Sequence, residues 1–228
     1  GNPNLKPSDH YNLDLKWDFN PTPTELISLT AFYKLIKNPI SRIEVASAGG
    51  YLSYENIADK ATVAGVEIEI RKNLFVRPVS NAAHGMNKLS LGLNGSYIYT
   101  NAKMPLATVT TGSQLEGAAP WIVNFDLSHN FTKGERSFVN TLVLNYVSDK
   151  IYTIGTQGYQ DIMEQGVLTL DFVSQAKLNK HLSLNLKARN LLNPSYKLSR
   201  KANENGEKVI LNDYKKGINI SLGVSCTF

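Results

Sequence analysis

The chain has few residues that cross-link proteins and no long apolar run. Its single cysteine, Cys226, excludes an internal disulfide and a zinc site built from several cysteines. No apolar stretch approaches the ~18 residues that a membrane-spanning helix needs, and the N-terminus shows no secretion-signal pattern. The lack of such a run does not argue against a membrane β-barrel, because a barrel strand crosses a bilayer with ~9–11 tilted residues.

The sequence also lacks a run of charge of one sign. The formal net charge is +5, but lysine and arginine are scattered along the 228 residues. A nucleic-acid-binding surface would need these residues gathered in a patch or a stripe. We therefore expect no nucleic-acid partner.

Residues that favour strands and turns are abundant. The chain contains 16 glycines and 11 tyrosines, together with many asparagine, serine and threonine residues. Aromatic and β-branched side chains suit a pleated sheet, and glycine and asparagine suit tight turns. An all-β protein is the first expectation.

Apolar and polar side chains alternate most regularly at the end of the chain. Small or polar residues separate the apolar ones there, and the same period of two recurs at 11–19, 66–71, 121–128 and 182–189. The apolar positions of the last segment are Ile218, Ile220, Leu222, Val224, Cys226 and Phe228.

With the less regular runs at 25–37, 88–100, 136–148 and 164–178, the pattern predicts about nine strands. Their connections alternate in length. Short connections are expected at 20–24, 132–135 and 179–180, and long ones at 38–60, 101–118, 149–163 and 193–213. Outer-membrane barrels have short periplasmic turns and long extracellular loops, so the last strand should end in the periplasm. The connection at 73–87 is long where a short one is expected.

One long connection has a pattern of its own. Residues 42–45 and 51–54 flank Gly49 and Gly50 in the manner of a hairpin turn. We expect a β-ribbon there that continues two strands above the membrane.

The two faces of the strands separate a membrane barrel from a soluble β-sandwich, which also alternates. The face opposite the apolar one carries too many charges for a small dry core, whereas a wide, wet lumen accommodates them. Aromatic residues also gather near strand ends, as in the interfacial girdles of barrels. The charged positions are Asp14, Lys16, Glu67, Glu69, Asp126, Lys187 and Arg189.

The predicted fold class is therefore all-β, an antiparallel up-and-down transmembrane β-barrel of which the chain supplies part. About nine strands begin on one side of the membrane and end on the other. A closed antiparallel barrel with both termini on one side needs an even number of strands. An odd number of further strands is expected upstream.

Short motifs follow one another along nearly the whole chain. Residues 1–7 read GNPNLKP, 31–40 read AFYKLIKNPI, 54–56 read YEN, 61–67 read ATVAGVE and 189–193 read RNLLN, and the last residue is Phe228. In this order the motifs resemble those of TonB-dependent receptors, particularly the Bacteroidetes type. Ser8 stands where a glutamate is usual in that family.

The resemblance implies a barrel of about 22 strands with an N-terminal plug. Residues 1–228 would be the C-terminal segment of the barrel domain, and the plug and the upstream strands would lie outside the chain. The implied function is import of a nutrient, such as a siderophore, cobalamin, glycan or peptide, across the outer membrane of a Gram-negative cell. No cofactor is implied.

The partners that the resemblance implies are outer-membrane lipid, the barrel-insertion machinery and a surface lipoprotein. An energy-transducing inner-membrane complex would act through the absent plug. Within this chain the segment with Ile220, Leu222, Val224 and Phe228 is the candidate assembly signal. Phe228 as a simple lipid-facing anchor is an equal and compatible alternative.

Three tyrosines fall in predicted extracellular loops, where aromatic rings often stack on sugars or haem-like ligands. Tyr152, Tyr159 and Tyr196 are therefore candidate ligand contacts, with ordinary loop packing as the alternative. Glu67 and Glu69 lie two residues apart on one face, which suggests either a cation site or charges paired with Arg71 or a lysine.

Two other functions compete with nutrient uptake. An outer-membrane hydrolase would need a nucleophile beside a base, but the histidines at 10, 84, 129 and 181 fall singly on different elements. We expect no enzyme activity, no catalytic residue and no metal site. A complete small structural or adhesive barrel is the third hypothesis, and strand parity opposes it.

Overall fold

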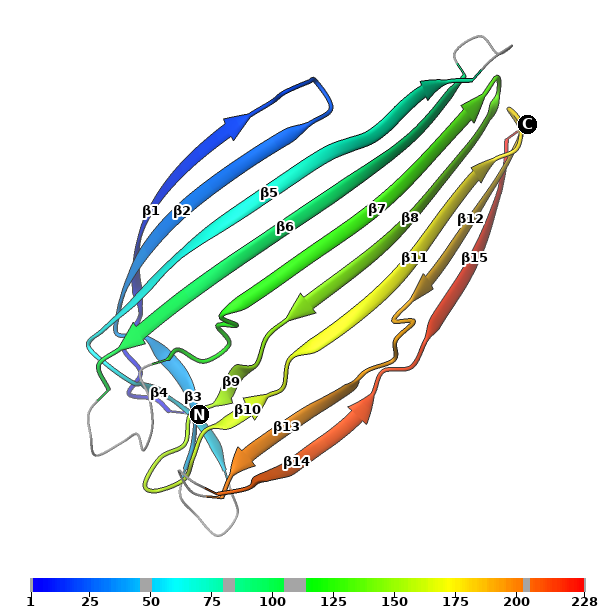
Figure 1. Ribbon diagram of the computed structural model, residues 1–228. Coiled ribbons are helices and arrows are strands. Elements are labelled where there is room, and N and C mark those ends of the chain that lie inside the picture. Colours follow the sequence, from blue (N-terminus) through cyan, green and yellow to red (C-terminus); the bar gives the residue numbers. More distant parts are fainter. Residues whose placement is uncertain (1, 46–50, 80–84, 105–113, 203–205, 228) are drawn as a thin grey trace.

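The computed structural model describes residues 2–45, 51–79, 85–104, 114–202 and 206–227. Within these ranges every regular element is a β-strand, and no helix is long and apolar enough to cross a membrane. Figure 1 shows most of the chain as one large curved sheet.

Nine antiparallel strands form this sheet, which we call the wall. They lie side by side in chain order, and β1 and β15 are its two edges, so the wall is an open part of a barrel (Figure 1). The strands are β1 (Asp9–Phe19), β2 (Leu26–Lys37), β5 (Lys60–Pro78), β6 (Met86–Ala102), β7 (Trp121–Lys133), β8 (Arg136–Val147), β11 (Val167–Lys177), β12 (Leu182–Arg189) and β15 (Asn219–Cys226).

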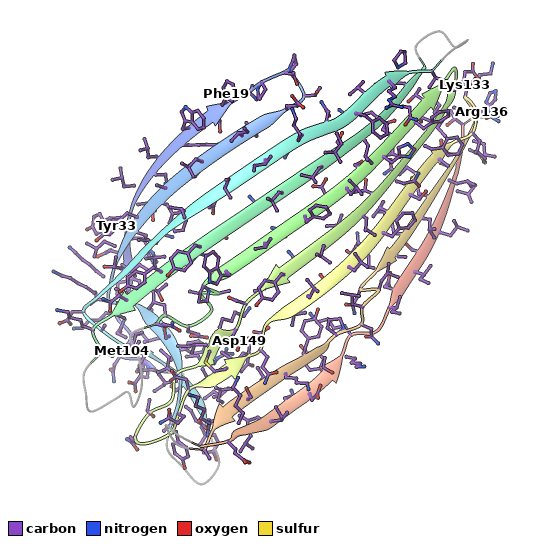
Figure 2. The ribbon with its side chains drawn as sticks, in the orientation of Figure 1. Phe19, Tyr33, Met104, Lys133, Arg136 and Asp149 are labelled. Carbon is purple, nitrogen blue, oxygen red and sulfur yellow. The ribbon has the colours of Figure 1, made fainter. Side chains whose placement is uncertain are left out.

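The connections alternate in length as the sequence predicts. The turns between β1 and β2, β7 and β8, and β11 and β12 are short and lie at one end of the wall. The four longer connections lie at the opposite end, which we call the loop end (Figure 1). In Figure 2, Lys133 and Arg136 mark the turn end, and Met104 and Asp149 mark the loop end.

The expected long connection at 73–87 is mostly strand, which corrects the sequence analysis. β5 continues to Pro78 and pairs with β6 down to Met86, so only residues 79–85 connect the two strands. A register shift between Asn73 and Phe75 makes Leu74 a β-bulge. The hairpin therefore extends past the end of β2 and has no reason to show the alternation of a lipid-facing strand.

A buried carboxylate secures the turn between β1 and β2 against β5. Glu25 forms an ion pair with Lys72 at 3.0 Å and accepts the backbone N–H of Asn73, also at 3.0 Å. These two donors hold the pKa of the Glu25 carboxyl below its ordinary value. The pairing of β2 with β5 stops at Leu26 and Arg71. Without Glu25, the Asn73 N–H on this edge of β5 would therefore lack a hydrogen-bond acceptor.

The register separates two faces of the wall. On one face, polar residues from seven neighbouring strands lie directly opposite one another. On the other face, an apolar row crosses the same strands one position away. The polar row is Asp18, Ser28, Glu69, Asn94, Asn124, Asn145 and Thr169, and the apolar row is Trp17, Leu29, Ile68, Gly95, Val123, Tyr146 and Leu168.

The apolar face, here called the outer face, is open. Leu15 on β1 is 74% exposed and Leu222 on β15 is 70% exposed. Neither side chain is part of a buried core. The polar face is covered at one end by loops, so it is not fully exposed to solvent. This segregation matches the predicted barrel with its apolar side chains toward lipid and its polar side chains toward a wet interior.

The compact core of the chain lies at the loop end and not within the wall. It packs onto Ala61 and Ala102, which belong to the polar, inner face of β5 and β6. The loops thus fold over the inner face. The buried members are Ile43, Ile57, Ala58, Ala61, Ala102, Leu115, Ile151 and Ile154.

The predicted β-ribbon is present as β3 (Ile40–Glu44) paired with β4 (Leu52–Asn56). The Gly49–Gly50 turn proposed for it lies outside the described residues. A second sheet was not predicted. It contains β9 (Lys150–Thr153), β10 (Ile162–Glu164), β13 (Ser195–Lys201) and β14 (Lys208–Lys215) in the order β14-β13-β10-β9.

The close approach at Gly65 gives a prediction. A Cβ at Gly65 would overlap the Phe32 ring and the carbonyl oxygen of Tyr97. Gly65→Ala in the protein that contains this chain should therefore lower the free energy of unfolding by about 1–3 kcal/mol. Urea titration in lipid vesicles measures it.

Gly95→Ala is the matched control for Gly65→Ala. Its Cβ would meet only Ile68 Cγ2, at an ordinary distance of 3.7 Å. We expect a change within about 0.5 kcal/mol. Equal effects of the two substitutions would show that the Phe32 contact does not set the packing at Gly65.

Candidate functional site

The motifs that resemble one family meet at the loop end of β1. Asn56 donates its amide to the carbonyls of Lys6 (3.0 Å) and Asn38 (2.9 Å), and its side-chain oxygen accepts the Lys6 N–H (2.8 Å). The Ser8 hydroxyl donates to the same Asn38 carbonyl at 2.6 Å. The opening segment, the end of β2 and the end of β4 are thereby joined, so these motifs have a structural role.

A cation from the ribbon links it to two other connections. The Arg42 guanidinium lies 3.1 Å from the Glu116 carboxylate and 3.8 Å from the centre of the Tyr152 ring. It also donates from Nε to the Tyr152 carbonyl at 3.1 Å. The Arg42 and Glu116 side chains are each only 21% exposed, so this pair is partly shielded from water.

A second, similar cluster lies on the same ribbon. Arg200 of β13 forms an ion pair with Glu44, and its guanidinium lies 5.3 Å from the centre of the Tyr159 ring. The ribbon also pairs with the chain at Ile154, through the Glu44 N–H to the Ile154 carbonyl and the Ile154 N–H to the Arg42 carbonyl, both at 3.1 Å.

These contacts join all four long connections into one unit, which we call the loop cap. It comprises the described parts of residues 38–59, 103–120, 148–166 and 190–218. Its buried core and its two arginine clusters fix the connections against one another. The cap is a preorganised surface over the inner face of the wall.

A small cleft lies where the inner face meets the second sheet. Its volume is about 130 Å³, and its lining combines amide and hydroxyl groups with the Lys150–Glu164 ion pair (3.3 Å) and one aromatic side chain. Such a lining can bind a polar ligand by hydrogen bonds and ring stacking. The lining residues are Asn145, Val147, Ser148, Lys150, Glu164, Gln165, Val167, Thr169 and Tyr196.

The three tyrosines expected to contact a ligand lie in different settings. Tyr152 packs under Arg42, and Tyr159 is 42% exposed beside Arg200. Tyr196 lines the cleft, stacks on Tyr214 with 5.5 Å between ring centres, and lies under the Lys216 ammonium at 3.9 Å. The ring contacts found within the described ranges do not join these three rings to one another.

An asparagine ladder on the inner face was not recognised from the sequence. Asn124 donates to the Asn94 side-chain oxygen at 3.3 Å, and Asn145 donates to that of Asn124. Nearby, Ser128 and Thr141 share a hydrogen bond at 3.0 Å. Strand register alone brings these residues together. The ladder could therefore be predicted only if the register of β6, β7 and β8 were known.

Glu69 pairs with a residue of its own strand, which is the second of the two interpretations given for Glu67 and Glu69. It forms an ion pair with Arg71 at 2.7 Å. Across the described residues no group of three or more histidine, cysteine, aspartate or glutamate side chains could hold a metal ion.

The histidines that the structure describes lie apart, as the sequence suggests. His10 is on β1, His129 bonds to Asn87 at 2.9 Å, and His181 contacts the Thr227 carbonyl at 2.7 Å. His84 lies outside the described residues.

The RNLLN motif forms the bend between β12 and β13. Asn190 and Asn193 adopt positive φ values of 58° and 43°, a conformation that asparagine tolerates. Asn190 donates its amide to the Gly217 carbonyl at 2.7 Å, and Asn193 accepts the Gly217 N–H at 3.1 Å. The motif thus fastens the bend of one strand to the bend between β14 and β15.

The candidate assembly residues lie on the last strand of the wall. Ile220, Leu222 and Val224 project from the outer face of the edge strand β15 and are 68%, 70% and 61% exposed. Phe228, the fourth member of that set, lies outside the described residues.

A family model described as "TonB dependent receptor-like, beta-barrel" matches residues 1–191. The chain belongs to this family. No curated protein matches the chain.

One solved structure is similar in fold. It is the ferric yersiniabactin uptake receptor FyuA from Yersinia pestis, with a TM-score of 0.65 and 15% sequence identity. The match covers 97% of this chain and 30% of that one, so the chain spans less than a third of that receptor's length. At this identity the likeness carries the barrel fold alone.

The loop cap of this TonB-dependent receptor barrel gives a second prediction. Arg42→Gln leaves the Glu116 carboxylate without its ion pair and removes the contact with the Tyr152 ring. We expect the cap to lose about 1–3 kcal/mol of stability. Limited proteolysis of the intact protein in increasing urea should show cleavage in the cap at a lower urea concentration.

Lys197→Gln is the matched control for Arg42→Gln. Lys197 pairs with Asp213 at 3.5 Å on the exposed surface of the second sheet. Such surface pairs contribute about 0–1 kcal/mol. Identical cleavage profiles for the two variants would contradict the role assigned to Arg42.

Proposed function

We propose that the chain is the C-terminal part of the barrel of an outer-membrane receptor that imports a nutrient into a Gram-negative cell. The observation that carries this proposal is the family match over residues 1–191 on a wall whose apolar face is open. The order of the GNPNLKP, KNPI and RNLLN motifs supports a receptor of the Bacteroidetes type.

The open edges of the wall support further strands from the same protein. An unpaired edge strand in lipid would leave backbone N–H and C=O groups without partners, at a cost of several kcal/mol each. We propose that upstream strands pair with β1 and β15 and close the barrel. The polar inner face, with its asparagine ladder, suits a wet interior that contains a plug.

The loop cap is the part of the chain that we assign to ligand capture. The long connections are expected to face outward, and Tyr152, Tyr159 and Tyr196 all belong to the cap. Tyr196 is the strongest candidate contact because it lines the cleft. The similar structure is a ferric yersiniabactin uptake receptor, but siderophore, cobalamin, glycan and peptide are all candidate ligands here.

Three partners follow from this assignment. An energy-transducing inner-membrane complex would act through the plug, and the barrel-insertion machinery would recognise the segment with Ile220, Leu222, Val224 and Phe228. A surface lipoprotein is a further candidate partner at the loop cap. The chain itself is proposed to take no cofactor and to catalyse no reaction.

Uptake gives a third prediction. A strain that lacks the whole gene should lose accumulation of one class among labelled ferric siderophores, cobalamin, oligosaccharides and peptides. A protonophore should abolish the same accumulation in the parent strain. Tyr196→Ala should raise the apparent KM several-fold at equal abundance of the receptor in the outer membrane.

Tyr33→Ala, on the lipid-facing side of β2, is the control for Tyr196→Ala and should leave the KM unchanged. If deletion affects none of the four classes, or if uptake persists without the proton gradient, the proposed transport function is wrong.

The assembly segment gives a fourth prediction. Deletion of Phe228 from the full-length protein should lower the folded, heat-modifiable fraction in the outer membrane several-fold. Phe228→Leu keeps an apolar anchor but removes the aromatic ring, so it separates signal from anchor. Unchanged abundance after the deletion would count against a signalling role.

A further inference from the structure

Three lysines form a row across the outer face of β2, β5 and β6 at the loop end. Lys37 and Lys60 are direct partners in the register. Lys103 directly follows Ala102, the last residue of β6 and the partner of Ala61, and it lines one groove together with Lys60. All three residues are exposed. Since neighbouring strands lie ~4.8 Å apart, the row spans about 10 Å.

The row lies four residues beyond two tyrosines on the same face. Two positions inward from the lysines are Leu35, Thr62 and Asn101, and two further inward are Tyr33, Ala64 and Tyr99. Tyr33 is 46% exposed and Tyr99 is 50% exposed. Tyrosine and tryptophan occupy the level of the lipid headgroups in membrane proteins. The ammonium groups therefore lie at the level of the outermost headgroup atoms.

A groove continues from this row down onto the apolar face. Its volume is about 390 Å³, and its lining passes from the charged ends of Lys60 and Lys103 to the apolar side chain of Leu35. Asp59, Thr62 and Asn101 complete the lining. A groove with a cationic end and an apolar end matches an amphiphile with an anionic headgroup better than a fully soluble anion.

The ammonium groups are available to such a headgroup. None of the seven ion pairs within the described part of the chain includes Lys37, Lys60 or Lys103. Lys37 contacts the Tyr11 ring, with 5.2 Å from Nζ to the ring centre. Asp9, opposite Lys37, and Asp59, in the groove, are the carboxylates of this region, and three lysines exceed them.

From these observations we propose that the lysine row binds the phosphate groups of a lipid in the outer leaflet. The ligand is a phosphorylated glycolipid of the lipid A type, whose acyl chains lie against the apolar outer face of β2, β5 and β6. Lysine clusters at a membrane surface attract anionic headgroups in this way. This inference rests on the proposed outer-membrane location, with the loop end facing outward.

The test uses the full-length receptor in vesicles that contain lipid A, with dephosphorylated lipid A and inorganic phosphate as the other probes. The triple variant Lys37→Gln, Lys60→Gln and Lys103→Gln should bind phosphorylated lipid A at least about tenfold more weakly than the parent protein. Dephosphorylated lipid A should bind the parent and the variant equally weakly. Native mass spectrometry of the released complexes provides the measurement.

Two further variants make the result specific. Lys201→Gln, Lys208→Gln and Lys215→Gln changes the net charge equally on exposed residues of the second sheet and should bind like the parent. Replacement of the three lysines of the row by arginine keeps the charges and should preserve binding. Heat modifiability of the glutamine variant itself shows whether its loss of binding comes from misfolding.

Equal lipid A binding by the two glutamine variants would overturn the proposal. So would equal affinity of the parent for inorganic phosphate and for lipid A, because the site would then bind a free anion. In either case nutrient uptake by the parent would still support the receptor function. A protein that fractionates away from the outer membrane would overturn the proposed function instead.

Discussion

The hydrogen-bond demand of the polypeptide backbone governs this chain, because lipid offers no partner for N–H or C=O groups. Nine antiparallel strands meet that demand by pairing in chain order. Pairing in register then forces alternate side chains to opposite faces, which places leucine, tyrosine and tryptophan on one side and asparagine, serine and charged groups on the other. The barrel wall needs no dry core, since its apolar side chains have lipid as their solvent.

The part of the chain at the loop end lies outside the lipid and is stabilised differently. At the loop end the connections bury a small apolar core around Ile57 and Ile154 and share two arginine clusters. A second sheet satisfies the backbone of β9, β10, β13 and β14. The chain thus combines two modes of folding, one determined by the membrane and one by conventional packing, and the RNLLN bend joins them.

The wall could be predicted from the sequence to a greater extent than the loop end. All nine wall strands were predicted, five from the period of two that lipid on one side imposes on residues such as Ile220, Leu222 and Val224, and four from less regular runs. The strands of the second sheet were not, because β10 has three residues and β14 places Val209, Ile210 and Leu211 in succession instead of alternating. The hairpin at 73–87 was mistaken for a loop for a similar reason. The asparagine ladder and the cleft at Tyr196 depend on residues distant in sequence, and no local pattern reveals them.

The mutual contacts of the four long connections have a consequence for how the proposed receptor could change its specificity. The ribbon touches Glu116, Ile154 and Arg200, which belong to three other connections. Exchange of one loop for that of a homologue would therefore remove supports from the remaining three. New ligand preferences should arise more readily by substitution of outward-facing side chains, or by transfer of the entire loop assembly, than by grafting single segments.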